Sequence, residues 1–250
     1  MFKVRSTQKY FLSIAATDTT GEAGITKDCK IANQFGFNTL GAVTAITIQD
    51  DNGVKNIYPL DGSILEEQLD ICSTFDVNCL KIGVLGNKKN ALIVAESLSK
   101  FPQAIKVWDP VFSPTSGESF VMDSDIGDIL WALLPEIDIL TPNFSELAKI
   151  LNIIDPKHDN WQRSAHDMAK KYDVALFVSG GHSDTEDILI REFLIDKERI
   201  ICLSKMRTPL RYQHGTGCTL STTLACYMTL ATDIVKACRK STELVDLLYT

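Results

Sequence analysis

The sequence predicts an α/β protein whose mainly parallel sheet is covered by helices on both faces. Short apolar runs alternate along the chain with longer blocks of helical periodicity, which is the pattern of parallel strands joined by helices. With 250 residues, of which 45% are hydrophobic and 23% charged, the chain is long enough to bury one large core. No internal repeat, low-complexity tract or linker interrupts the alternation, so we expect a single domain over residues 1–250.

The first half of the chain is predicted to open with a buried strand, because Tyr10–Ala16 is a short apolar run followed by a polar turn. A helix over Ala23–Phe35 follows, and Gly36 stops it. The short run Val54–Tyr58 is an edge strand or a flap. Further strands are expected at Gly41–Ile48, Cys79–Leu85 and Ile105–Trp108, and further helices at Gly62–Phe75 and Lys88–Lys100.

The second half continues the alternation after a loop at Val111–Ser119. Asp187–Leu194 and Arg199–Leu203 are predicted to form a hairpin around a polar turn. Helices are expected at Asp125–Leu134, Ser145–Leu151, Trp161–Tyr172 and Thr219–Leu230, strands at Ile137–Leu140 and Val174–Val178, and a last short helical piece at Glu243–Leu248.

Polar residues gather where the predicted strands end. In a mostly parallel sheet, ligands lie beyond the carboxyl ends of the strands. The residues expected at this edge are Asp18, Gln49, Asp109, Asn143, Gly180, Gly181 and, by extension, Gly215–Cys218. Their clustering favours an enzyme.

The segment from His214 to Cys218 predicts a helix that begins with a nearly bare backbone, because two glycines directly precede an apolar helical run. The unpaired N–H groups and the positive end of the helix dipole at such a terminus form an anion site. A thiol in the first turn should have a lowered pKa, because the dipole favours the thiolate. The alternative is a structural turn in which Cys218 is a small buried hydrophobe.

Composition excludes several classes of protein. The formal net charge of −7 argues against general nucleic-acid binding, which needs a basic surface. No run approaches the ~18 uninterrupted apolar residues of a membrane span, and the start lacks the apolar stretch of a secretion signal. The seven cysteines are scattered and include no C-x-x-C, so no zinc site or disulfide framework is indicated. We expect a cytoplasmic protein that binds a small molecule.

Together the motifs resemble those of the hydroxymethylpyrimidine/phosphomethylpyrimidine kinases of thiamin synthesis, in the ribokinase-like superfamily. The resemblance runs from about Tyr10 to Tyr227, with every motif in family order. The matching segments are IAATDTTGEAGI (residues 14–25), VTAITIQ (43–49), KIG (81–83), DPV (109–111) with SGE (116–118), LTPN (140–143) with Glu146, GGH (180–182) and HGTGCTLS (214–221). The resemblance implies a ribokinase-like three-layer α/β/α sandwich and a kinase that uses ATP and Mg²⁺.

The resemblance also assigns residues to roles in transfer and substrate binding. Cys218 would accept the proton of the substrate hydroxymethyl group as its oxygen attacks the γ-phosphorus. The backbone of Gly215, Thr216 and Gly217 would hold the charge that develops on the transferred group. The residues implied to contact the pyrimidine are Asp28, Gln49 and Ala23, with Ala16 behind the substrate. From the residues alone, Asp28 could be a solvated helix carboxylate and Gln49 a turn residue.

For the nucleotide and the metal, the resemblance implies two further groups. Asn143, Ser179, Gly180, Gly181 and Thr216 would bind the nucleotide, whereas Asp109 and Glu146 would hold Mg²⁺, often through water. The N-x-x-E spacing of Asn143 and Glu146 is equally the signature of a helix capping box. His214 is interpreted as structural support rather than chemistry.

The chain departs from the family pattern at several positions. Ala16, Thr19 and Glu22 replace Gly, Pro and Gly, and Thr115 and Ser179 stand where the family has lysines that would face the nucleotide phosphates. We hypothesise that Lys205, Arg207 and Arg211 replace these cations. The alternatives are a pyridoxal or pyridoxine kinase of the same fold, or a non-catalytic relative that binds a pyrimidine or vitamin. The resemblance also suggests a homodimer.

Overall fold

The computed structural model describes residues 8–50, 53–113, 120–153, 160–180, 188–212, 214–230 and 233–250. The strands are β1 (Tyr10–Thr17), β2 (Asn38–Asp50), β3 (Gly53–Pro59), β4 (Val77–Ile82), β5 (Ile105–Trp108), β6 (Ile139–Leu140), β7 (Ala175–Val178), β8 (Leu189–Ile195) and β9 (Ile200–Met206). The helices are α1 (Gly24–Gln34), α2 (Gly62–Cys72), α3 (Lys88–Ser97), α4 (Asp123–Leu133), α5 (Phe144–Leu151), α6 (Trp161–Tyr172), α7 (Thr216–Thr229) and α8 (Ile234–Tyr249), with short 3₁₀ turns at Leu98–Lys100 and Leu134–Glu136.

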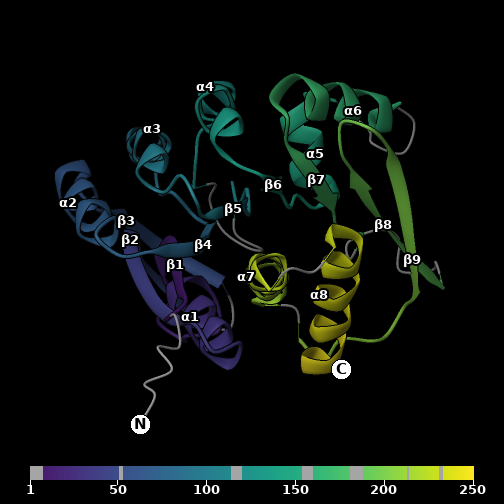
Figure 1. Cartoon of the computed structure of the whole chain (residues 1–250), viewed down its shortest axis with the longest axis horizontal. Helices are drawn as coiled ribbons and strands as arrows, with labels where there is room; N and C mark the ends of the chain where they lie inside the picture. Colours follow the sequence, from purple (N-terminus) through teal and green to yellow (C-terminus); the bar gives the residue numbers. More distant parts are fainter. Residues whose placement is uncertain are drawn as a thin grey trace, which may run out of the picture.

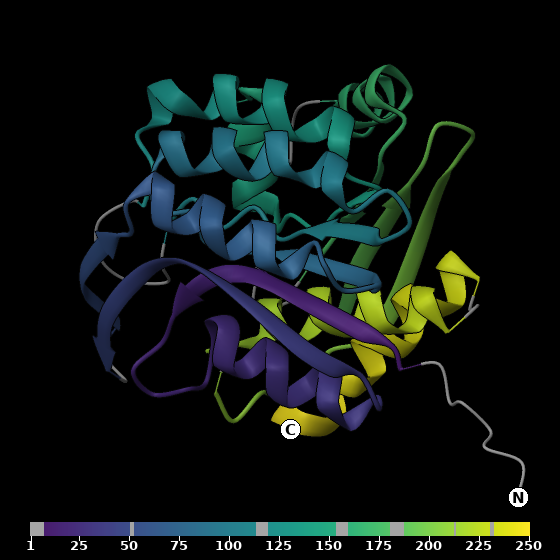
Figure 2. The same ribbon diagram turned by 60° about the vertical axis from the view of Figure 1, so that its left-hand side comes forward.

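The described strands form one nine-stranded sheet in the order β3-β2-β1-β4-β5-β6-β7-β8-β9. The pairs from β2 to β7 are parallel, whereas β3 and the β8–β9 hairpin add antiparallel strands at the two edges. Figure 2 shows β2 curving past the end of β1 to pair with β3. The predicted edge strand and the predicted hairpin are both confirmed.

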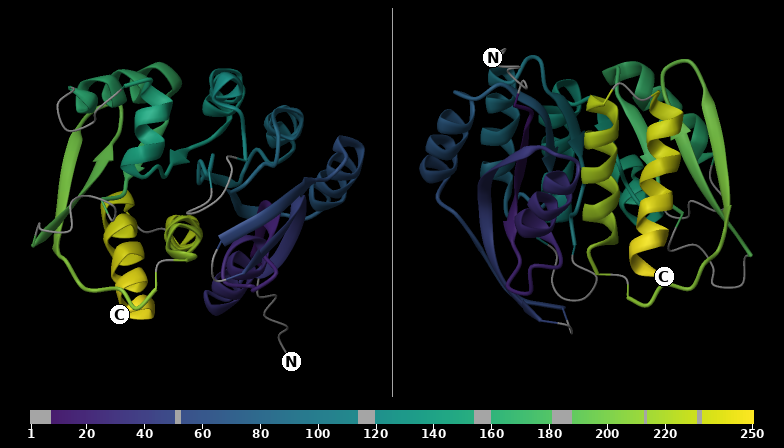
Figure 3. Two further views of the ribbon diagram at one scale, coloured as in Figure 1. Left: turned by 180° about the vertical axis from the view of Figure 1, so that it is seen from behind. Right: turned by 60° about the horizontal axis from the view of Figure 1, so that its bottom comes forward.

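Helices cover both faces of the sheet, which makes three layers. In Figure 1, α2, α3, α4, α5 and α6 lie on one face, and α1, α7 and α8 lie on the other. Figure 3 shows α7 and α8 side by side on their face of the sheet. The predicted three-layer α/β/α sandwich is therefore confirmed.

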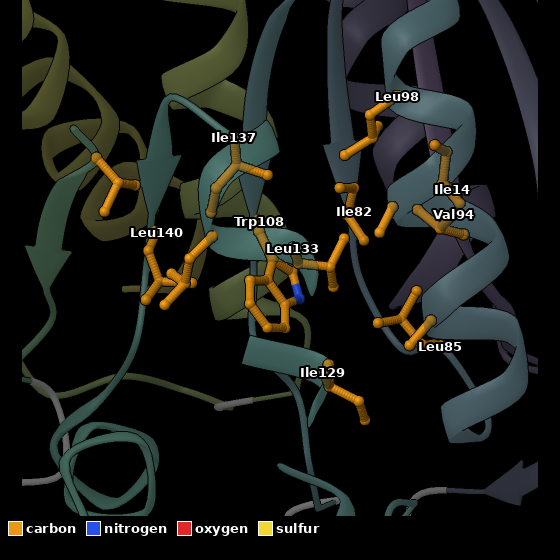
Figure 4. Packing of buried hydrophobic residues seen from close by; sticks show 14 of the residues in the cluster. Ile14, Ile82, Leu85, Val94, Leu98, Trp108, Ile129, Leu133, Ile137 and Leu140 are labelled. Carbon is orange, nitrogen blue, oxygen red and sulfur yellow. The ribbon is translucent and has the colours of Figure 1, made fainter. Parts of the chain in front are cut away.

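Alternation along the strands builds a separate core on each face. In β5, Val107 belongs to the core beside α7 and α8, whereas Trp108 points into the core beneath α3 and α4. Figure 4 shows Trp108 packed among Leu133, Ile137 and Leu140. A strand that is buried on both faces must be apolar at successive positions, which explains the continuous apolar runs in the sequence.

One predicted element was wrong in extent. The short helical piece expected at Glu243–Leu248 is part of α8, which begins at Ile234 and has 16 residues. Asp233 caps this helix by accepting hydrogen bonds from the backbone N–H groups of Val235 and Lys236 at 3.0 and 3.3 Å. Within the described residues, no helix combines the length and the apolar character that a membrane span requires.

Candidate active site

A cavity of about 600 Å³ opens at the carboxyl ends of the parallel strands. Its lining brings together most of the polar residues expected at this edge: Asp18, Gln49, Asp109, Asn143 and Gly215–Cys218. The prediction that these segments meet, although they lie far apart in the sequence, is confirmed. Gly181 lies outside the described residues, as does Thr115.

The Gly215 turn approaches its neighbours so closely that a side chain would not fit. Gly215 has φ +82°, and a Cβ atom there would lie 2.0 Å from the backbone oxygen of Glu22. Two residues on, a Cβ atom on Gly217 would meet the Asp109 carboxylate at 3.8 Å. The start of α7 therefore lies between the β1–α1 loop and the residue that follows β5.

Cys218 lies in the first turn of α7, next to a buried ammonium group. The Nζ atom of Lys81 is 3.4 Å from the Cys218 sulfur, 3.1 and 3.2 Å from the two Asp28 carboxylate oxygens, and 3.7 Å from Asp109 Oδ2. Lys81 and Asp28 have no exposed side-chain surface. One cation therefore faces two carboxylates and a thiol.

The prediction of a lowered Cys218 pKa was wrong. Burial raises the pKa of the Cys218 thiol to about 11; the charge of Lys81 opposes this shift, and the negative charges of Asp28 and Asp109 add to it. The helix N-terminus alone was the basis of the prediction, and it does not outweigh the loss of water around the thiolate. A thiol with this pKa is mostly protonated at neutral pH.

Asp28 does not lie where a direct contact with the pyrimidine was expected. Its side chain is fully buried behind the cavity wall and is not part of the cavity lining. Its oxygens accept hydrogen bonds from Ser13 Oγ at 2.6 Å and Thr222 Oγ1 at 2.9 Å, besides the contact with Lys81. The carboxylate is thus held by internal donors, and we correct its expected role from substrate contact to partner of Lys81.

One end of the cavity is built around Asp18. This buried carboxylate accepts hydrogen bonds from the Ala23 backbone N–H at 2.7 Å and the Thr20 N–H at 2.8 Å, and lies 3.0 Å from His214 Nε2. Burial raises the pKa of Asp18, but hydrogen bonds from His214, Thr20 and Gln49 outweigh burial, and the pKa is lowered overall. His214 therefore ties the α7 turn to the β1–α1 loop, in agreement with its interpretation as structural support.

The remaining predicted substrate contacts, Ala16, Ala23 and Gln49, line the cavity on the same side as Asp18. The Ala16 carbonyl oxygen would lie 2.3 Å from a Cβ atom on Gly24, which has φ +58°. The loop between β1 and α1 therefore packs tightly against the end of β1, and the cavity wall here is closely fitted.

Asn143 and Glu146 form a capping box at the start of α5, as one of the two readings of their spacing predicted. Asn143 Oδ1 accepts from the Glu146 N–H at 2.9 Å, and Glu146 Oε2 accepts from the Asn143 N–H at 2.8 Å. Both residues also line the cavity. Burial, followed by the charge of Asp109, raises the pKa of Glu146 to about 8.

Asp109 and Glu146 are thus two carboxyl groups that disfavour each other's ionisation. Burial also raises the pKa of Asp109, against the opposing charge of Lys81. Within the described residues, no group of three or more His, Cys, Asp or Glu side chains is arranged to hold a metal. A buried and a half-buried carboxyl group at one cavity wall fit a hard cation that keeps several of its waters, as Mg²⁺ does.

The other end of the cavity lies between the β8–β9 hairpin and α8. Ser179 lines it, but Gly180 is not part of the lining, and a Cβ atom on Gly180 would lie 2.2 Å from the Arg191 carbonyl oxygen. Of the three cations hypothesised to replace the family lysines, Lys205 and Arg207 line the cavity and Arg211 does not. Lys205 is paired with Asp246 at 2.7 Å.

Glu192 is a lining residue that the sequence reasoning missed. Its side chain is buried in β8, where Glu192 Oε2 accepts a hydrogen bond from Thr242 Oγ1 at 2.9 Å. Burial raises the pKa of Glu192, and the nearby charge of Lys205 lowers it in part. A single Glu in an alternating hairpin strand gives no sequence signal, because the usual reading is a solvated position.

The fold and this cavity define a kinase of the ribokinase-like class. The structure of a phosphomethylpyrimidine kinase from Clostridium difficile superimposes with a TM-score of 0.80 at 26% identity, covering 95% of this chain and 98% of that one. The structure of a pyridoxal kinase from Staphylococcus aureus in complex with ADP gives a TM-score of 0.85 at 21% identity, covering 95% and 86%, which supports the shared fold.

The sequence comparisons identify the family within this class. The family model described as phosphomethylpyrimidine kinase matches residues 18–248, and the chain belongs to this family of phosphotransferases. It is 30% identical over 228 residues to the hydroxymethylpyrimidine/phosphomethylpyrimidine kinase of Rhizobium meliloti, covering 90% of this chain and 85% of the relative. It is 28% identical over 243 residues to the protein of that name in Staphylococcus aureus, covering 96% and 87%.

Proposed function

We propose that this protein transfers the γ-phosphoryl group of ATP to hydroxymethylpyrimidine and then to its monophosphate, in thiamin biosynthesis. The observation that carries the proposal is the lining of one cavity by Gln49, Cys218 and the Gly215–Gly217 turn. An amide can pair with an aminopyrimidine edge, which offers an NH₂ donor beside ring-nitrogen acceptors. The family and the names of its members support the same substrates.

In the first transfer, this chain's own groups act on the substrate oxygen and on the moving phosphoryl group. The Cys218 sulfur, as thiolate, accepts the proton of the hydroxymethyl group while the oxygen bonds to the γ-phosphorus and the bond to ADP breaks. The backbone of Gly215, Thr216 and Gly217 holds the charge on the transferred group. Asn143, Ser179, Gly180, Gly181 and Thr216 are proposed to bind the nucleotide.

The second transfer makes a smaller demand on Cys218. The attacking atom is then an oxygen of a phosphate monoester, which has already lost its second proton in most molecules above about pH 7, because that pKa is near 6. No proton has to be removed from this oxygen. Comparing the rates of the two transfers therefore distinguishes the contribution of the Cys218 thiol from that of the other residues of the site.

Asp109 and Glu146 would hold Mg²⁺, in part through water. A bound cation would relieve the mutual repulsion of these two carboxyl groups. When bound, the ion would neutralise charge on the ATP phosphates. Arg207, which lines the cavity, would add positive charge near the nucleotide phosphates, whereas Lys205 is paired with Asp246 at 2.7 Å.

The test is a coupled ADP-release assay with Mg·ATP and either hydroxymethylpyrimidine, its monophosphate or pyridoxal, in the wild type and in Cys218→Ala. We expect turnover of both pyrimidines, with a loss of about 100-fold or more in Cys218→Ala for the alcohol, within the usual range for a general base, and a smaller loss for the monophosphate. Cys202→Ala, which changes an exposed cysteine of β9, is the matched control and should be neutral.

Two outcomes would contradict the proposal. Turnover of pyridoxal alone would assign the protein to the pyridoxal kinases. Absence of turnover, with a pyrimidine still raising the melting temperature, would identify a binding protein. We also propose a homodimer, which light scattering on the purified protein tests directly.

A further inference from the structure

Lys81 belongs to a motif that the catalytic assignments above leave without a role. It extends from β4, and Gly83 follows two positions later on the same side of the strand. A Cβ atom on Gly83 would lie only 2.9 Å from Lys81 Nζ. Because Gly83 has no side chain, the Lys81 ammonium group has room at this position. The glycine and the lysine of the motif therefore depend on each other.

The ammonium group has three protons and three partners. They are the Asp28 carboxylate, Asp109 Oδ2 and the Cys218 sulfur, at distances of 3.1 to 3.7 Å from Nζ. These partners come from α1, from the residue after β5 and from the first turn of α7. One buried lysine thus fixes the position of the Cys218 thiol relative to Asp28 and Asp109.

Asp28 is what keeps this lysine charged and oriented. The carboxylate is itself held by Ser13 and Thr222, from the strand and the helix on either side. A buried ammonium group without such a partner would lose its proton. The ion pair with Asp28 therefore holds the positive charge of Lys81 in place beside the Cys218 sulfur.

We propose that Lys81, anchored by Asp28, is a positioning residue that holds the Cys218 sulfur in place and compensates its negative charge when it accepts the substrate proton. This inference rests on the proposed function, because only in that function does the Cys218 thiolate accept a proton from the substrate. The charged and titratable groups that act on Cys218 are Lys81 from β4, Asp28 from α1, Asp109 after β5 and Tyr249 from α8. Lys81 is the cation in this set, and its removal leaves the sulfur facing two carboxylates.

The test measures the reactivity of Cys218 without any kinase assay. The protein is treated with iodoacetamide between pH 7 and 10, and the modified Cys218 peptide is quantified by mass spectrometry. Lys81→Met should slow alkylation at pH 8 about tenfold or more, because the thiolate becomes rarer. Asp28→Asn should also slow alkylation, because the ammonium group loses its anchor, but by less than Lys81→Met, because Asp109 still pairs with Lys81 and one negative charge near the sulfur is gone. Lys88→Met, at an exposed ion pair on α3, is the matched control.

The unequal effects of the two variants separate a charge effect from simple loss of structure. Lys81→Met leaves Asp28 buried without its cation and can destabilise the protein. The double variant Lys81→Met/Asp28→Asn removes both charges and should fold, yet it should still alkylate several-fold more slowly than the wild type, because the cation beside the sulfur is gone. Wild-type reactivity in the double variant, or equal slowing in Lys81→Met and Asp28→Asn, would overturn the proposal.

Steady-state kinetics add a second readout for Lys81. Loss of the lysine should lower kcat for hydroxymethylpyrimidine about 100-fold while KM for ATP stays within about threefold, because the nucleotide binds elsewhere in the cavity. A parallel rise in KM for ATP with no change in kcat would contradict the assignment. If the protein proves not to phosphorylate pyrimidines, the alkylation results still decide whether Lys81 controls Cys218.

Discussion

The thiol of Cys218 is mostly protonated at neutral pH, because burial raises its pKa to about 11. If the thiolate is the base, kcat/KM for hydroxymethylpyrimidine should rise about tenfold per pH unit between pH 7.5 and 9.5, since this parameter reports ionisations of the free enzyme. The monophosphate needs no such proton transfer and should give a much flatter profile. Initial rates at saturating Mg·ATP across this range provide the measurement; equal slopes for both substrates would remove Cys218 from the role of base.

Glu146 couples stability to pH in a direction that can be worked out from its raised pKa. The folded pKa of about 8 lies above the ordinary value of 4.5, so the folded protein keeps a proton that the unfolded chain has lost. This contribution to stability is fully present below pH 4.5 and is lost as the pH rises through 8.

Glu146→Gln should therefore be more stable than the wild type at pH 8.5, by about 1–3 kcal/mol, and equally stable near pH 4.5. The glutamine oxygen can still accept the Asn143 N–H, so the capping box survives. Thermal unfolding at the two pH values measures the effect, with Glu66→Gln on the exposed face of α2 as control. The same variant should lose Mg²⁺-dependent turnover; a variant equally stable at both pH values would contradict the raised pKa.

At single residues, the sequence could predict which side chains meet at the cavity but not how each is used. Ordered motifs were sufficient to bring Cys218, Gln49 and Glu146 together. The role of Asp28 and the pKa of Cys218 were predicted wrongly, because both depend on Lys81, 53 positions from Asp28 in the sequence. When a charged side chain is buried by a segment far away in the sequence, the residues around it show no pattern that predicts the burial.

Among the elements, α8 was the least predictable, although it packs against α7, the helix that carries Cys218. Tyr249 is fully buried, and its hydroxyl lies 2.9 Å from Thr219 Oγ1, one residue after Cys218. The sequence around Asp233 carries a capping residue, but the buried face of α8 includes Ala237, Cys238, Ser241 and Thr242, small and hydroxyl side chains that do not form an obvious apolar stripe in the sequence.

Tyr249→Phe should cost about 1 kcal/mol by loss of the hydroxyl contact, and Tyr249→Ala about 3–5 kcal/mol by loss of the packed ring. Urea unfolding of the wild type, Tyr249→Phe and Tyr249→Ala measures whether the free energy of unfolding falls in this order. Because Thr219 follows Cys218 directly, Tyr249→Phe should also lower kcat modestly. A Tyr249→Ala variant as stable as the wild type would show that α8 does not pack on α7 in solution.

The connection from β9 to α7 carries Arg207 and Arg211, two of the cations hypothesised to replace the family lysines. Arg207 lines the cavity and Arg211 does not, so their charges are not equivalent. Arg207→Glu should raise KM for ATP about tenfold or more, because a negative charge would face the phosphates, whereas Arg211→Glu should change it less than threefold. ATP titrations in the ADP-release assay compare the two, and equal effects would contradict a specific role for Arg207.

For the whole molecule, the layer architecture follows from periodicities that are visible in the sequence. Apolar runs at successive positions require burial on both sheet faces, and the intervening amphipathic helices provide the two covers. The β3 strand and the β8–β9 hairpin extend the sheet at its edges with antiparallel pairs, which the short polar turns indicated. The depth of the cavity could not be predicted, because it depends on side chains from both halves of the sheet.

Since the cavity is lined by segments from β1 to α8, a bound ligand should stabilise the entire fold rather than one part of it. At a free ligand concentration 100 times Kd, binding adds about 2.7 kcal/mol, which for a chain of this size raises Tm by roughly 5–10 °C. Differential scanning calorimetry with a non-hydrolysable ATP analogue, Mg²⁺ and hydroxymethylpyrimidine measures the shift. Cys218→Ala should show a similar shift, because it keeps the cavity and lacks the thiol, whereas Gly215→Ala should lose it, because the new methyl group displaces the turn. An unchanged shift in Gly215→Ala would mean that the ligands bind away from the α7 turn.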